Sequence, residues 1–168
     1  MFDIKDRHES QRGYFSYALY KAVEDNPNIV LVTADLGYAI FDKLREDFPN
    51  NFINTGAAEQ LAMGICIGLA ESGKIPVFYS ISPFGVFRPM EWIRNYINHE
   101  KCPVKIFLSG SGQDYAHDGF THFADDIPEF LDLFKNIEKY YPTSPDGARI
   151  VTEFALKNNE PSIIILRR

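Results

Sequence analysis

The segments "VKIFLS" (104–109) and "SIIILR" (162–167) decide the fold class, because both are almost continuous apolar runs. Strands covered by helices on both faces of a sheet have this composition, whereas strands with one wet face alternate between apolar and polar residues. The other strand candidates are 28–34, 51–54, 76–82 and 137–142, and the helix candidates are roughly 10–25, 39–47, 57–72, 87–99, 125–133 and 144–157.

Strands that alternate with helices of this length pair in parallel through right-handed crossovers. We therefore expect an α/β fold, a three-layer α/β/α sandwich with a mostly parallel sheet. The chain has 168 residues, which predicts a single domain over residues 1–168. The longest irregular segment, 109–124, follows a strand. Ligands in open α/β sheets bind beyond the carboxyl ends of strands, so this loop is a candidate site.

The composition excludes several classes of protein. A net charge of −6 without a basic patch argues against a nucleic-acid binder. The longest apolar run, residues 61–70, is too short to span a bilayer, so we expect no membrane segment. Cys66 and Cys102 are too few for a disulfide framework, and free thiols in a cytoplasmic protein are expected.

One helix candidate places a carboxylate beside apolar residues. In "NTGAAEQLAMGICIGLAESGK" (54–74), Thr55 or Gly56 can cap a helix that begins near Ala57. Glu59 then lies in the first turn, where the helix dipole favours a negative charge. On this pattern alone, Glu59 does no more than stabilise the helix start.

The same helix contains two glycines that lower its stability. Gly64 and Gly68 are four residues apart and share a face. Each costs a helix about 0.5–1 kcal/mol relative to alanine. A face without side chains admits a close neighbour, which can be a strand, a helix of the same domain, or a helix of another subunit.

Six segments occur in an order that resembles the pyrimidine-binding domain of the transketolase family of thiamine-diphosphate enzymes. The likeness covers about residues 10–168. The segments are "QRGYFSYALYKAVEDNPNIVLVTADLG" (11–37), "NFINTGAAEQLAMGICIGLAESGKIPVF" (51–78), "RPMEWIRN" (88–95), "HDGFTHFADDI" (117–127), "YYPTSPDGARIVTEFAL" (140–156) and "PSIIILRR" (161–168).

The resemblance implies a cofactor-activating role for Glu59. A glutamate on this helix of the family hydrogen-bonds N1′ of the aminopyrimidine ring of thiamine diphosphate. Proton sharing there favours the 4′-imino tautomer, whose nitrogen can take the proton from C2 of the thiazolium ring. Aromatic residues of the next loop pack against the ring, which implies Phe84 or Phe87 in "SPFGVFR" (82–88). Without the resemblance, both are ordinary core phenylalanines.

Other matched positions imply contacts with the substrate and the cofactor. Asp118 and His122 match residues that line the substrate channel, where His122 would hydrogen-bond the donor near its carbonyl. Arg12 and Arg168 match positions that bind a sugar phosphate, a task suited to the guanidinium fork. Asp35 matches an acidic position near the cofactor and the subunit contact. For all five, a turn or surface residue without a ligand is the structural alternative.

The chain also departs from the family pattern. Phe120 stands where the family has proline in its Asp-Gly-Pro-Thr-His loop. The sequence "SGSG" around Gly110 replaces a further substrate histidine, and "YAI" near Ala39 replaces a phosphate-binding serine. Two polar contacts with a sugar phosphate are therefore missing, and the identity and phosphorylation of the sugar are open.

Half of the family's cofactor site has no counterpart in this sequence. The Gly-Asp-Gly motif that binds diphosphate and Mg²⁺, with its downstream Asn, is absent, and so are a metal-ligand cluster and the family's additional C-terminal domain. The resemblance therefore implies a split enzyme in which a separate diphosphate-binding subunit supplies Mg²⁺. An α2β2 heterotetramer is expected, because the family builds paired sites around two-fold symmetry.

The first hypothesis is thus a subunit of a transketolase-like transferase that moves a two-carbon ketol unit between sugars in carbohydrate metabolism. Another thiamine-diphosphate activity is the alternative within enzymes, either deoxyxylulose-phosphate-synthase-like or 2-oxoacid-dehydrogenase-β-like. A non-catalytic assembly partner is a second class, and a free-standing small-molecule binding module is the third.

Overall fold

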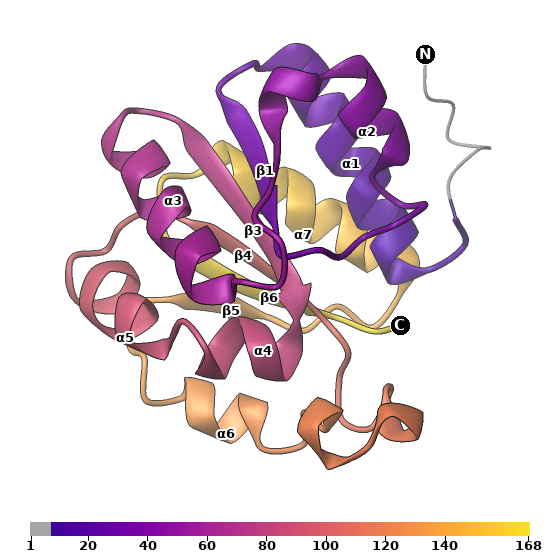
Figure 1. Ribbon diagram of the computed structural model, residues 1–168, viewed down its shortest axis with the longest axis vertical. Helices are drawn as coiled ribbons and strands as arrows, with labels where there is room; N and C mark the ends of the chain where they lie inside the picture. The colour runs from indigo at the N-terminus through magenta and orange to yellow at the C-terminus, as the bar shows by residue number, and fades with distance from the viewer. Residues whose placement is uncertain (1–7) are drawn as a thin grey trace.

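A computed structural model describes residues 8–168, so residues 1–7 of the expected domain lie outside the described part. Within residues 8–168 the chain forms one parallel sheet of six strands with helices on both faces (Figure 1). The predicted three-layer α/β/α fold is confirmed. From one outer strand to the other, the order is β2 (Phe52–Asn54), β1 (Ile29–Thr33), β3 (Ile75–Ile81), β4 (Lys105–Ser109), β6 (Ser162–Leu166) and β5 (Glu138–Tyr140).

Successive side chains of each central strand enter two different cores. In β3, Val77 and Tyr79 belong to the core on one face of the sheet, while Phe78 belongs to the core on the other. In β6, Ile163 and Ile164 divide in the same way. Both faces are dry, which explains why these strands are continuous apolar runs rather than alternating ones.

Each face of the sheet has its own set of helices (Figure 1). The first core is covered by α3 (Glu59–Glu71), α4 (Ser82–Phe87), α5 (Met90–Trp92), the π-helical η3 (Ile93–His99) and α6 (Ile127–Leu131). The second core is covered by α1 (Gln11–Asp25), α2 (Asp42–Asp47) and α7 (Pro145–Lys157). Three short 3₁₀ turns complete the described chain: η2 (Pro49–Asn51), η4 (Ala116–Asp118) and η5 (Phe120–His122).

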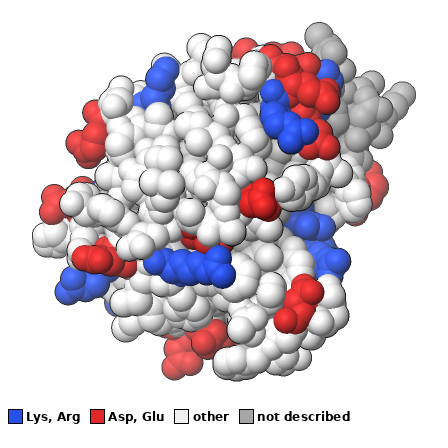
Figure 2. Space-filling view, in the orientation of Figure 1, with Lys and Arg blue, Asp and Glu red and all other residues white. Residues whose placement is uncertain are grey.

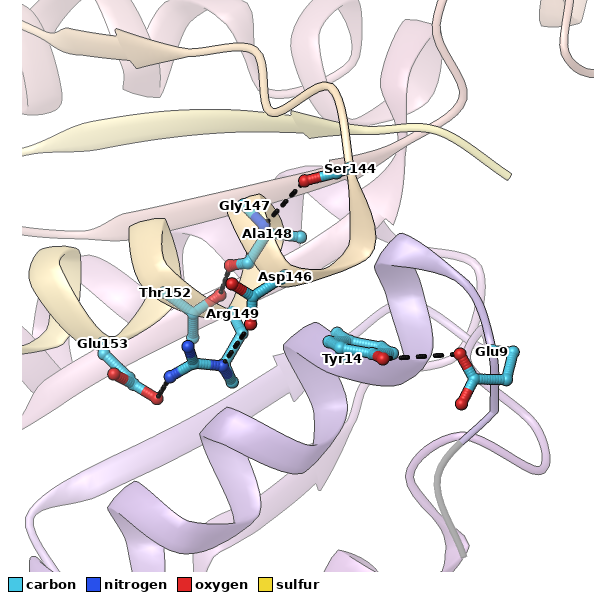
Figure 3. Close-up of polar contacts among 9 residues, drawn as sticks. All are labelled: Glu9, Tyr14, Ser144, Asp146, Gly147, Ala148, Arg149, Thr152 and Glu153. Carbon is cyan, nitrogen blue, oxygen red and sulfur yellow. Dashed lines mark hydrogen bonds and ion pairs between the residues drawn. The ribbon is translucent and has the colours of Figure 1, made fainter. Parts of the chain in front are cut away.

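The two long helices of the second core begin at serine caps. The Ser144 side chain accepts a hydrogen bond from the backbone N–H of Gly147 (Figure 3), and Ser10 does the same for Gly13 at the start of α1. In the same view Arg149 joins Asp146 and Glu153 of its own helix, at 2.9 and 2.7 Å. The two serine caps satisfy backbone amide groups that have no partner within the helix.

The predicted cap of α3 is wrong. The helix begins at Glu59, and its N-cap residue, Ala58, has no side-chain hydrogen bond. The hydroxyl of Thr55 donates instead to the carbonyl of Thr33 at the end of β1, at 3.3 Å. Thr55 therefore joins the turn to the sheet, and the first turn of α3 is left with Glu59 as its acidic residue.

The loops that follow β1 and β3 diverge at the carboxyl edge of the sheet. From β1 the chain runs outward to β2, and from β3 it runs the other way to β4. Such a reversal in strand order opens the crevice in which open α/β sheets bind ligands. The segment after β4 returns to this edge beside α4 (Figure 1), and a bridge between Gly112 and Ala124 closes its base.

The rest of the described chain offers neither a membrane span nor a metal centre. None of the helices within residues 8–168 is long and apolar enough to cross a membrane. Among the same residues, no group of three or more His, Cys, Asp or Glu side chains is placed to hold a metal ion.

Candidate functional site

Glu59 is buried at the carboxyl edge of the sheet. It follows β2 in the chain, its residue is 2% exposed, and it begins α3. The hydroxyl of Ser80, on β3, lies 3.4 Å from Oε1, and Nη1 of Arg88 donates to Oε2 at 2.7 Å. Carboxylates are almost never this deeply buried without a partner, so the ion pair with Arg88 is part of what holds Glu59 in place.

Arg88 connects Glu59 to an aromatic ring. It caps the C-terminus of α4, and its guanidinium carbon lies 4.0 Å from the centroid of the Phe84 ring. The same ring meets His122 edge-on, with centroids 4.8 Å apart. Residues from α3, α4 and the loop after β4 thus form one continuous set of contacts, which brings together three residues predicted for the site.

Phe84 and Phe87 lie in different surroundings, although one helical turn separates them. Phe87 is 42% exposed and packs edge-on against Phe130 of α6, at 5.1 Å between centroids. A pocket of about 480 Å³ opens beside both phenylalanines. Its lining includes four phenylalanines and two acidic residues: Pro83, Phe84, Phe87, Arg88, Phe120, Thr121, Phe123, Asp125 and Asp126.

Tyr115 lies at the centre of the remaining predicted residues. It is 9% exposed, and its hydroxyl forms a 2.7 Å hydrogen bond with that of Ser109 at the end of β4. Nη1 of Arg12 lies 3.4 Å from the same hydroxyl, and the guanidinium of Arg168 lies over the ring at 5.0 Å. The rings of Tyr115 and His122 are 6.4 Å apart. The structure therefore brings Arg12, Arg168 and His122 around one tyrosine.

His117, which lies beside this tyrosine, links Arg168 and Asp118 in an exposed polar cluster. Nε2 of His117 lies 3.0 Å from Nη1 of Arg168, and the same nitrogen lies 3.3 Å from a carboxylate oxygen of Asp118. Asp118 thus reaches Arg168 through His117, a residue for which the sequence indicates no role. The cluster can present cationic and neutral donors to an anionic ligand.

Asp35 lies apart from these contacts. It is exposed in the loop after β1, with a left-handed backbone at φ 58°. Its carboxylate accepts hydrogen bonds from Tyr38 at 2.5 Å and from Asn54 at 3.4 Å. These two hydrogen bonds lower the pKa of Asp35. They tie it to its own loop and to β2, not to Glu59.

The glycine face of α3 has no close neighbour within the described chain. A Cβ built at Gly68 meets no atom of residues 8–168 within 4 Å, and one built at Gly64 meets only Trp92, at 3.9 Å. Leu61, on the same helix, is 57% exposed. Figure 2 shows that the surface over α3 is almost free of charged side chains. Tight packing within residues 8–168 therefore does not explain the glycines.

The comparison with known families decides the identity of this fold. A family model described as the transketolase pyrimidine-binding domain matches residues 10–168. The chain belongs to this family. Its six ordered segments and its sheet are thus those of a transketolase pyrimidine-binding domain, and the predicted resemblance is confirmed.

Three similar proteins place this pyrimidine-binding domain among larger enzymes. One of the subunits of apulose-4-phosphate transketolase from Actinobacillus succinogenes is 31% identical over 146 residues, which cover 86% of this chain and 47% of that protein. The 1-deoxy-D-xylulose-5-phosphate synthase of Clostridium perfringens is 29% identical, over 92% of this chain and 25% of the synthase. A solved structure described as "Split gene transketolase, inactive beta4 tetramer" superposes with a TM-score of 0.84 at 30% identity, over 95% of this chain and 52% of that one.

The chain therefore spans about half the length of the first and third of these relatives and a quarter of the synthase.

The site geometry also contains three residues that the sequence did not assign: Arg88, Tyr115 and His117. Arg88 stands in the segment "RPMEWIRN", so the resemblance could have pointed to it. For Tyr115 the sequence offers no signal, because its role depends on contacts with Ser109 and Arg12.

Proposed function

We propose that the chain is the pyrimidine-binding subunit of a split, thiamine-diphosphate-dependent transketolase. The observation that carries this proposal is the burial of Glu59, at 2% exposure, and its ion pair with Arg88, which lies over Phe84 and lines the pocket beside it. A buried carboxylate can share a proton with a ring nitrogen, and an aromatic wall can stack against the ring. The residues present thus fit an aminopyrimidine.

Each residue has a role that its surroundings support. Glu59 holds the proton at N1′ of the pyrimidine, and Phe84, which contacts both Arg88 and His122, is the stacking ring rather than Phe87. Thiamine diphosphate, if bound there, would supply an acidic thiazolium carbon as the nucleophile for a ketose carbonyl. Asp118 holds a substrate hydroxyl, and His122, as a catalytic residue, hydrogen-bonds the donor near its carbonyl. Asp35 supports the subunit contact near the cofactor.

The basic cluster around Tyr115 is the proposed site for the anionic end of a sugar phosphate. Arg12 and Arg168 approach this ring from opposite ends of the chain, and His117 extends the cluster. Arginine binds phosphate through paired donors, which favours phosphorylated substrates.

A separate subunit completes the proposed enzyme. The sequence lacks the Gly-Asp-Gly motif, so the partner is proposed to bind the diphosphate and Mg²⁺, within an α2β2 assembly in the cytoplasm. The open glycine face of α3, with exposed Leu61 beside it, offers a surface for that partner. The buried, unpaired thiols Cys66 and Cys102 fit a reducing compartment.

A second candidate is a synthase that joins a two-carbon unit to an aldose phosphate. The 29% identity with 1-deoxy-D-xylulose-5-phosphate synthase over 160 residues favours this alternative. The two activities differ in the donor substrate, so assays with a ketose phosphate and with pyruvate separate them.

The test is reconstitution with a partner. The subunit is purified alone and together with a Gly-Asp-Gly-bearing subunit, and ketol transfer is measured with thiamine diphosphate and Mg²⁺. We expect no activity alone and activity together, reduced about 10²–10⁴-fold in Glu59→Gln, the range typical of acid–base groups. Glu71→Gln, a change at the other end of α3, is the matched control. Activity of the subunit alone, or an active pair that tolerates Glu59→Gln, contradicts the proposal.

A further inference from the structure

Arg88 lies where the proposed function expects the aminopyrimidine ring. Its guanidinium donates to Oε2 of Glu59 at 2.7 Å and lies 4.0 Å from the centroid of the Phe84 ring. These are the two contacts assigned to the cofactor, a hydrogen bond to the carboxylate and stacking on the aromatic wall. One side chain of the subunit makes both.

The carboxylate of Glu59 is almost closed to solvent, and Arg88 is its more exposed partner. Glu59 is 2% exposed as a residue, while the side chain of Arg88 is 47% exposed. A ring nitrogen must come within about 3 Å of a carboxylate oxygen to share a proton. Because almost no surface of Glu59 is open, a ring cannot reach it by the route that Arg88 occupies until the guanidinium moves.

The guanidinium also resembles a protonated aminopyrimidine in its chemistry. Both are planar and cationic, both direct N–H groups toward a carboxylate, and both stack on aromatic faces. We propose that Arg88 occupies the pyrimidine subsite of the free subunit, keeps Glu59 paired, and leaves when the cofactor enters. This inference rests on the proposed function, since it concerns the same subsite.

The surroundings of Arg88 allow such a displacement. A half-exposed guanidinium remains hydrated when it leaves an ion pair, so the cost of separation falls on Glu59, which gains the ring nitrogen as a new partner. Asp125 and Asp126 line the same pocket as Arg88 and are exposed. They offer the guanidinium an acidic alternative at the rim of the pocket.

The test measures binding of the pyrimidine fragment to the isolated subunit. The probe is 4-amino-5-hydroxymethyl-2-methylpyrimidine, titrated by calorimetry or by NMR into the full chain. We expect Arg88→Ala to bind it about tenfold more tightly than the wild-type protein, because removing a competing state that is about 90% populated raises apparent affinity by that factor. Methylguanidinium in the buffer is expected to reverse the gain.

Arg94→Ala is the matched control, because Arg94 is exposed on the nearby η3 and its guanidinium donates to Asn95. It is expected to bind the probe as the wild type does. Arg88→Gln is a second variant in case the alanine variant does not fold. Equal or weaker binding by both Arg88 variants, or no binding by any variant, overturns the proposal.

A double-mutant cycle supplies a second readout that needs no ligand. Arg88→Ala leaves the Glu59 carboxylate without its strongest partner, so the melting temperature is expected to fall, and Glu59→Gln in the same chain to restore it. Independent, additive shifts overturn the inferred pairing in solution. Loss of this inference would leave Glu59-dependent ketol transfer in the assembled pair intact, whereas failure of the proposed function would remove that activity.

Discussion

Two ionisable side chains, Glu59 and Lys105, are buried at opposite edges of the sheet, and their partners differ in kind. Lys105, at the amino edge, is 1% exposed and donates to Oδ1 of Asn158 at 3.0 Å and to the carbonyl of Glu160. Glu59, at the carboxyl edge, is 2% exposed and is paired with a half-exposed arginine. The lysine is held by groups that end α7, whereas the glutamate is held by a side chain at the surface.

This difference separates a structural charge from one available to a ligand. The partners of Lys105 are a backbone carbonyl and an amide side chain close to the end of a helix, where a cation is favoured. Moving them would disturb α7 and the start of β6. The partner of Glu59 can be exchanged at little structural cost, since a guanidinium at the surface is hydrated in either position. Burial alone therefore does not separate these two charges; the exposure of their partners does.

The largest expected effect tests this distinction directly. Lys105→Ala is expected to lower the free energy of unfolding by about 2–3 kcal/mol, because it leaves a cavity and two acceptors without a donor. Glu59→Gln is expected to change it by less than about 1 kcal/mol, because the amide has the same shape and accepts from Arg88. Urea unfolding of both variants, with exposed Lys135→Ala as control, measures this. Equal losses of unfolding free energy in Lys105→Ala and Glu59→Gln would contradict the distinction between the two buried charges.

The next effect is the pH dependence of stability. Burial lowers the pKa of Lys105 to about 8, against the opposing influence of Glu160. Between about pH 8 and 10.5 the unfolded chain then binds more protons than the folded one, so the contribution of Lys105 to stability rises with pH, by about 2 kcal/mol from pH 8 to pH 10.

The measurement compares urea unfolding of the wild type and Lys105→Met at pH 8 and pH 10. Burial raises the pKa of Cys102 to about 11, and its contribution therefore falls as pH rises through this range. The difference between the two proteins removes that shared contribution. We expect the free energy of unfolding of the wild type to rise relative to that of the variant as pH rises. An unchanged difference between the two proteins would contradict the assigned pKa direction.

The smallest effect concerns backbone strain at the two edges. Ala39, in the loop after β1, and Lys101, before β4, both have left-handed backbones, with φ of 67° and 57°. Glycine relieves this strain but adds conformational freedom to the unfolded chain. Each change to glycine is therefore expected to raise the free energy of unfolding by about 0.5 kcal/mol. Thermal unfolding measures both. A loss in Ala39→Gly alone would show that the carboxyl edge depends on that side chain.

The strands of this fold were predictable from local pattern, but one helix was not. All six predicted strands are present in the described chain. The central ones were predictable because most residues buried between two helical layers are apolar. The sequence of α4, "SPFGVF", has Pro83 and Gly85 and was expected to be a loop. Pro83 lies in the first turn, where proline is tolerated, and a Cβ at Gly85 would meet Leu108 at 2.4 Å. Close packing on the sheet thus favours a helix that propensity disfavours.

The candidate site was predictable only as a set of residues. The resemblance named Glu59, Phe84 and His122. The structure joins Glu59 to Phe84 through Arg88, and Phe84 in turn contacts His122. Their roles in catalysis stay predictions. Arg88 and Glu59 are 29 residues apart, and local pattern contains no information on whether such a pair meets. Asp35 belongs to the same predicted set but contacts its own loop, which sequence could not distinguish either.

The sequence by itself determined the layers: apolar runs of strand length alternating with helical patterns leave a parallel sheet covered on both faces as the arrangement that buries them. The tertiary structure decided which polar groups meet at the carboxyl edge. The physical reason is that parallel strands carry loops distant in sequence to one edge, where a buried charge persists only if a partner arrives. That partner for Glu59 is Arg88, and its identity depends on the packing of α4 against the sheet.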